Sequence, residues 1–170
     1  MNIVFLGGIS GCGKSTAGKY LEEHLHWKHL EIDLSPVDGL VHHNLIAEAK
    51  KFETTADATQ LVGVLKNRYP GYAGIILTFP SVVVFPAPHV INNPKIKFRY
   101  LFGSPEHAVA RFIEREKATG RNLTTAYWEK NNVWVYKALE PVFNRPLLVN
   151  TLAADGSWRD RTAILEAITG

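Results

Sequence analysis

One segment near the start of the sequence has the residue types and spacing to bind phosphate. Residues 8–15, Gly-Ile-Ser-Gly-Cys-Gly-Lys-Ser, match G-x-x-x-x-G-K-[ST] at every fixed position. Glycines let the backbone curl so that successive N–H groups converge on phosphate oxygens at a helix N-terminus. Lys14 adds a positive charge for the β- and γ-phosphates, and the Ser15 hydroxyl suits Mg²⁺. The segment predicts binding of a nucleoside triphosphate, expected to be ATP with Mg²⁺, through Gly8, Ser10, Gly11, Cys12, Gly13, Lys14, Ser15 and Thr16.

The residues around this segment predict the elements that position it. Residues 2–6 form a short apolar run, which indicates a buried strand, and after Ser15 apolar residues recur at helical spacing. Such strand and helix patterns alternate, which predicts a three-layer αβα fold with a five-stranded parallel sheet and helices on both faces. Residues 81–94 fit either a strand or an irregular helix. The further strands are expected at 29–32, 74–79, 96–102 and 147–150, and the helices at 40–52, 57–67, from Ser104 onward, and at 158–168. The Ser104 hydroxyl is expected to cap the helix that begins there.

Composition sets limits on the class of protein. The 170 residues are 46% hydrophobic and 21% charged, as in an ordinary globular protein, and we expect one domain over residues 1–170. The net charge of +3 comes without a basic run, so we expect no nucleic-acid partner, and no apolar run is long enough for a membrane helix. The single cysteine, Cys12, indicates a reducing cytoplasm. Its side chain is expected to be a small filler, although a helix N-terminus could instead lower its thiol pKa. The chain could be a monomer or a homodimer.

Two classes of phosphate-binding protein are excluded by missing motifs. Guanine-nucleotide switches need N-K-x-D and transporter ATPases need L-S-G-G-Q, and neither occurs. Residues 8–21, together with residues 97–121, resemble the opening and the lid of the small P-loop kinases, the superfamily of adenylate, gluconate and shikimate kinases. The resemblance implies an ATP-dependent phosphotransferase.

A candidate lid spans residues 111–125. Arg111 and Arg115 are four residues apart and therefore project from one helix face, and Arg121 follows in a turn. By the resemblance, Arg115 and Arg121 would act in catalysis by neutralising charge on the transferring phosphoryl group, and Arg111 would contact nucleotide. The alternative is a solvated arginine face paired with neighbouring glutamates.

Asp33 is the candidate group for the phosphoryl acceptor. It follows the second predicted strand, at the sheet edge where ligands of open α/β sheets bind. The resemblance implies that Asp33 orients or deprotonates an acceptor hydroxyl, or holds a water on Mg²⁺, and that residues 34–70 form a helical acceptor-binding region. An Asx turn before a proline is the alternative role for Asp33.

The third predicted strand and the acceptor region each lack an expected group. The third strand ends without the acid that often binds metal there, so metal binding is expected to depend on Ser15 and waters. Residues 34–67 contain no arginine, which disfavours a dianionic acceptor such as a nucleoside monophosphate. The sequence therefore favours transfer of the γ-phosphoryl group of ATP to a hydroxyl of a small metabolite. A nucleoside monophosphate kinase-like enzyme and a P-loop regulator or slow NTPase without a small-molecule acceptor stay open.

Overall fold

The computed structural model describes residues 1–32, 45, 51–52, 54–55, 57–78, 92–120, 124–139 and 147–170. The predictions for Asp33, Arg121, residues 81–91 and most of the helix expected at 40–52 lie outside these residues. Among the described helices, none has the length and apolar character needed to cross a membrane.

Five parallel strands form a single sheet, as the alternating pattern predicts. The strand order is β2-β3-β1-β4-β5, which places β1 at the centre, between β3 and β4. β1 and β3 are buried along almost their whole length, because helices cover both faces of the sheet. The strands are β1 (Asn2–Gly8), β2 (Trp27–Glu31), β3 (Gly74–Thr78), β4 (Lys97–Phe102) and β5 (Leu148–Asn150).

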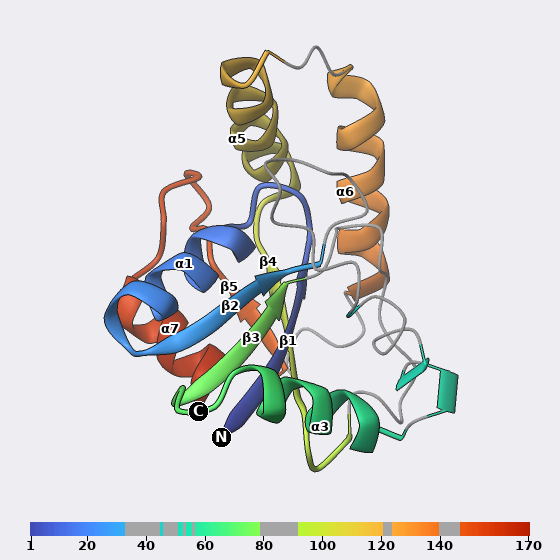
Figure 1. Ribbon diagram of the computed structural model, residues 1–170. Helices are drawn as coiled ribbons and strands as arrows, with labels where there is room; N and C mark the ends of the chain where they lie inside the picture. The colour runs from blue at the N-terminus through green and yellow to red at the C-terminus, as the bar shows by residue number, and fades with distance from the viewer. Residues whose placement is uncertain are drawn as a thin grey trace.

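The described helices divide between the two faces and one edge of the sheet. They are α1 (Lys14–His24), α3 (Thr59–Arg68), α5 (Pro105–Ala118), α6 (Thr125–Leu139) and α7 (Arg161–Thr169). Figure 1 shows α1 and α7 on one side of the sheet and α3 on the other. The pair α5 and α6 extends side by side beyond the edge where β1 ends. The αβα prediction is confirmed.

The core lies between the central strands and the helices. Val4, Leu6 and Leu77 are fully or almost fully buried, and Phe5 packs edge-on against Phe52 at a centroid separation of 5.4 Å. This packing fixes the central strand, whose end carries the phosphate-binding segment.

Two local predictions are wrong. The last helix begins at Arg161 rather than at Trp158, because the Asp160 carboxylate caps it by accepting from the Ala163 N–H at 2.8 Å. The Ser104 hydroxyl does not cap α5; it donates instead to a carboxylate oxygen of Glu106 at 3.0 Å. Both ends are decided by competition among nearby polar side chains, which residue spacing alone does not resolve.

Candidate functional site

The phosphate-binding segment forms a tight turn between β1 and α1. Gly11 and Gly13 both have φ of +84°, in the left-handed region that favours glycine. A Cβ atom on Gly11 would lie 1.8 Å from the carbonyl oxygen of Ala108, so the bare backbone is what lets the loop pack against α5. α1 begins with no side-chain cap and no acidic residue in its first turn. This helix N-terminus therefore presents its N–H groups and positive dipole end to an anion.

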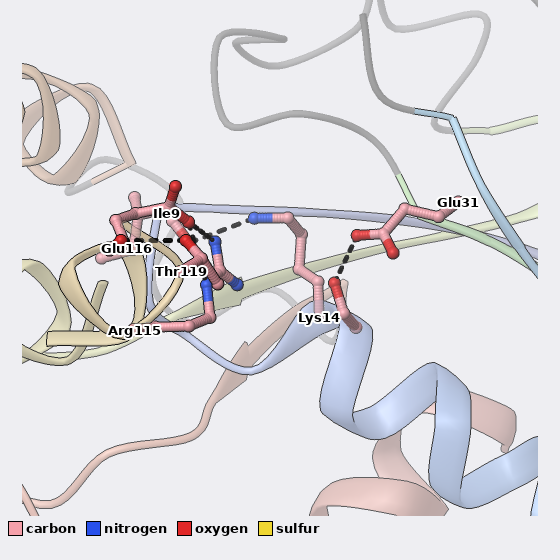
Figure 2. Close-up of polar contacts among 7 residues, drawn as sticks. Ile9, Lys14, Glu31, Arg115, Glu116 and Thr119 are labelled. Atoms are coloured by element: carbon pink, nitrogen blue, oxygen red, sulfur yellow. Dashed lines mark hydrogen bonds and ion pairs between the residues drawn. The ribbon is translucent and has the colours of Figure 1, made fainter. Parts of the chain in front are cut away.

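Lys14 holds its ammonium group at the loop. Its Nζ donates to the carbonyl oxygens of Gly8 at 2.9 Å and Ile9 at 3.2 Å, the second of which is drawn in Figure 2. Charge-assisted hydrogen bonds to phosphate oxygens are stronger than bonds to neutral carbonyls. The ammonium is therefore positioned to exchange these two partners for a polyphosphate.

Ser15 contacts a carboxylate that the sequence pattern did not single out. Its hydroxyl donates to Oε1 of Glu31 at 2.5 Å, as Figure 2 shows. Glu31 is the last residue of β2 and is half-buried. A hydroxyl and a carboxylate oxygen are the hard donors that Mg²⁺ prefers, so these two side chains fit a magnesium ion shared with phosphates. The available signal was position, since Glu31 is an acidic residue near the end of the second predicted strand, at the sheet edge where ligands of open α/β sheets bind.

The end of β3 is polar but carries no charge. Thr78 pairs in register with Glu31, is 2% exposed, and its hydroxyl bonds to Nε2 of His29 at 3.0 Å. Burial lowers the pKa of His29 below its ordinary value, which favours the neutral imidazole. The missing third-strand acid is thus replaced by a neutral hydrogen-bonded pair, and the carboxylate near Ser15 comes from β2.

Arg111 links α5 to the loop between β5 and α7. Its Nη2 donates to the Gly156 carbonyl at 2.6 Å, and its guanidinium lies over the Trp158 ring at 4.9 Å from the centroid. The Trp158 ring also packs against the phosphate-binding segment: a Cβ placed on Gly13 would lie only 2.7 Å from this ring. Trp158 is still 45% exposed. The predicted nucleotide-binding arginine therefore stands beside an aromatic ring at the loop.

A cavity of about 200 Å³ opens beside this ring. It lies between the start of α1 and the segment leading into α7, and its wall is mainly apolar. A flat ring next to Gly13 and Thr16 would stay within reach of phosphates bound at the N-terminus of α1. The lining includes Gly13, Thr16, Tyr20, Trp158, Arg159 and Arg161.

Cys12 behaves as a filler residue. Its side chain is fully buried, and burial raises the pKa of its thiol to about 12. The thiol is therefore neutral, and the expectation of a small packing residue holds over that of an activated thiolate. The Cys12 carbonyl accepts from the buried Thr151 hydroxyl at 3.1 Å, which ties the loop to the end of β5.

The structure describes residues 111–120 and 124–125 of the candidate lid. α5 ends at Ala118, and the backbone N–H of Thr119 bonds back to the carbonyls of Arg115 and Glu116. The Arg115 side chain is 58% exposed and pairs with the buried Glu116 carboxylate at 2.7 Å, as drawn in Figure 2. The exposed guanidinium is thus held by the adjacent glutamate, as in the alternative of an arginine face paired with neighbouring glutamates.

Comparison with known sequences gave no match, either to a family model or to a curated protein. Solved structures do match. The chain is similar to a deoxyadenosine kinase from M. mycoides with bound dATP, with a TM-score of 0.50 and 15% identity over 98% of this chain and 96% of that chain.

Two further structures match somewhat less well. A shikimate kinase from Acinetobacter baumannii in complex with shikimate has a TM-score of 0.49 and 17% identity, over 99% of this chain and 90% of that one. A gluconokinase from Sinorhizobium meliloti has a TM-score of 0.48 and 15% identity, over 99% and 89%. At such identities a structural match speaks for the fold alone. This chain has the fold of the small P-loop kinases.

Proposed function

We propose that the protein is a phosphotransferase that passes the γ-phosphoryl group of ATP to a hydroxyl of a small metabolite. The observation that carries the proposal is the phosphate cradle. An uncapped helix N-terminus, two glycines in the left-handed region and the Lys14 ammonium converge at the end of the central strand. Each of these features is suited to a polyphosphate anion.

Magnesium would be held on the side of Ser15 and Glu31. Bound there, Mg²⁺ supplies positive charge to the β- and γ-phosphates. Ser15 offers a hydroxyl oxygen, and the carboxylate of Glu31 keeps that hydroxyl oriented. The ammonium of Lys14, which lies at the start of the loop beside the Gly8 carbonyl, would neutralise charge on the same phosphates.

The base would lie in the cavity next to Trp158. Its apolar wall suits a flat heterocycle, and the Trp158 ring with the Arg111 guanidinium offers a stacking surface. Base stacking on an aromatic side chain contributes roughly 1–3 kcal/mol. This arrangement supports a nucleotide as the phosphoryl donor rather than inorganic polyphosphate.

The transfer step would form a bond between the acceptor oxygen and the γ-phosphorus. The bond from that phosphorus to the β–γ bridging oxygen breaks, and ADP leaves with the electron pair. We propose Asp33 as the group that takes the hydroxyl proton, because it follows Glu31 by two residues in the sequence. Arg115 and Arg121 are proposed to cover the transferring group, which requires Arg115 to exchange its Glu116 partner.

The charge of the phosphoryl acceptor can be inferred from the basic residues of the predicted acceptor-binding region. The absence of arginine from residues 34–67 favours an acceptor less charged than a nucleoside monophosphate. The rival function is a nucleotide-binding regulator or slow NTPase, which would bind ATP equally well but transfer phosphate only to water.

Binding and turnover are tested separately. Titration calorimetry with ATP and Mg²⁺ should detect binding, and Lys14→Ala should weaken it by roughly tenfold to a hundredfold, because a charged hydrogen-bond donor is lost. Lys19→Ala is the matched control, since Lys19 is exposed on the same helix. Absence of binding in the unsubstituted protein, or equal binding by Lys14→Ala, would refute the cradle.

Release of ADP is then followed with sugars, sugar acids, nucleosides and nucleotides as acceptors. Stimulation by a hydroxyl compound supports the kinase, and the phosphorylated product identifies the acceptor. If ATP binds but no acceptor raises ADP release above the rate with water, the regulator or slow NTPase is the better description.

A further inference from the structure

α6 reaches the phosphate-binding loop through one buried side chain. The amide nitrogen Nδ2 of Asn132 donates to the backbone carbonyl of Ser10 at 3.1 Å, across 122 positions of sequence. Asn132 is fully buried and Ser10 is 4% exposed. At the next residue, Gly11, the loop packs against the backbone of α5 at Ala108. The pair α5–α6 therefore contacts the loop at two successive residues.

The amide of Asn132 is only half satisfied. Its Oδ1 is buried and has no hydrogen-bond partner among the residues that the structure describes. A buried acceptor without a partner destabilises a fold relative to an apolar side chain of similar shape. Packing therefore does not explain an asparagine at this position, whereas the bond to the Ser10 carbonyl does.

The bond has a geometric consequence for the loop. In a trans peptide the C=O of one residue and the N–H of the next point in opposite directions. By holding the Ser10 carbonyl toward α6, Asn132 fixes the Gly11 N–H in the direction away from α6. Gly11 has φ of +84° and no side chain, so no side-chain packing at that residue restrains this peptide plane.

We propose that Asn132 is a positioning residue, which orients the Ser10–Gly11 peptide so that the loop is set for phosphate before ligand arrives. It thereby ties α6, the helix that follows the candidate lid, to the phosphate cradle. The proposal rests on the proposed function only in that the ligand is a polyphosphate.

The test removes the amide donor of Asn132 and keeps the volume of the side chain similar. Asn132→Leu has no donor, and Asn132→Asp, at a pH where the carboxyl is ionised, places an acceptor against the Ser10 carbonyl. Inorganic tripolyphosphate with Mg²⁺ is the probe, because it occupies the cradle without a base. Affinity should fall about five- to tenfold for Asn132→Leu, the value of one neutral hydrogen bond, and further for Asn132→Asp.

Asn131→Leu is the matched control. Asn131 is the adjacent residue on α6, and its Nδ2 is likewise buried with no hydrogen-bond partner in the described part of the chain. Its replacement should leave tripolyphosphate affinity within about twofold, since no loop bond is lost. Equal affinity of Asn132→Leu, Asn132→Asp and the unsubstituted protein would overturn the proposal.

A second readout needs no ligand. The Cys12 N–H bonds to the Ile9 carbonyl at 3.4 Å within the same turn, so its hydrogen exchange reports on loop order. Exchange should accelerate in Asn132→Leu and stay unchanged in Asn131→Leu, while the thermal midpoints of the two variants stay similar. If the unsubstituted protein bound no polyphosphate, the proposed function would fail, yet this exchange comparison would still decide the role of Asn132. Unchanged exchange in Asn132→Leu would refute it.

Discussion

The contact between Ser15 and Glu31 predicts a specific dependence on magnesium. Glu31→Gln keeps the size of the side chain and an oxygen that can accept from the Ser15 hydroxyl, but removes the charge. Hydrogen bonds to charged groups contribute roughly 1.5–3 kcal/mol and neutral ones about 1 kcal/mol. The difference of about 1 kcal/mol corresponds to about a fivefold change in an equilibrium constant.

The sign of that change depends on the metal. Without Mg²⁺, the Glu31 carboxylate repels a bound triphosphate, so Glu31→Gln should bind it about fivefold tighter than the unsubstituted protein. With Mg²⁺, the carboxylate attracts the ion that the phosphates carry, and the same variant should bind about fivefold more weakly. The order of the two affinities therefore inverts when the metal is added.

Calorimetry with a non-hydrolysable ATP analogue, in excess EDTA and then in excess Mg²⁺, measures both affinities. Glu22→Gln is the control, because Glu22 is a carboxylate of α1 that pairs with Lys28 rather than with Ser15. Its replacement should change neither value. A magnesium effect of equal size in Glu31→Gln and the unsubstituted protein would show that Glu31 does not act on the metal.

Three other outcomes test the loop, the base cavity and the end of β3. Gly11→Ala should lower the free energy of unfolding by about 1–3 kcal/mol, because alanine resists a φ of +84° and its Cβ would meet the backbone of α5. The thermal midpoint should then fall by roughly 2–10 °C, whereas Gly63→Ala, with open space around it, should be neutral or stabilising. Trp158→Ala should weaken ATP binding about five- to a hundredfold while tripolyphosphate affinity stays the same, and an equal loss for both ligands would contradict a base-stacking role. Burial lowers the pKa of His29, so the unfolded chain takes up a proton before the folded chain as pH falls through about 6.5. Stability to denaturant should therefore decline in that pH window. His29→Gln, which keeps a donor for Thr78, should flatten the decline.

The parts of the fold and site that sequence predicts are those whose interactions are local. All fixed residues of the phosphate-binding segment lie within eight positions, so their spacing alone determines the turn and the start of α1. The apolar runs likewise predict the five strands, because residues of a buried strand are themselves apolar and this shows in the sequence. The boundary of α7 was wrong by three residues, since the Asp160 cap competes with a helix-like apolar spacing that begins at Trp158.

Contacts between distant elements could not be predicted in the same way. Glu31 meets Ser15 because α1 packs against β2, and nothing in the spacing of residues 15 and 31 gives that packing. The bond from Asn132 to Ser10 spans 122 positions, so it too emerges only from tertiary structure.

The position of the carboxylate has a physical reason. Thr78 is almost fully buried, and an acid there would lose its hydration and would have the neutral His29 ring as its neighbour. At the end of β2, Glu31 is half-buried and can keep part of its hydration. An acid at the end of β2 therefore has a lower desolvation cost than an acid at the end of β3, and a side chain of glutamate length still reaches Ser15 from there. In the sequence Glu31 stands two residues before Asp33, so the proposed group for magnesium and the proposed group for the acceptor come from one short segment of the chain.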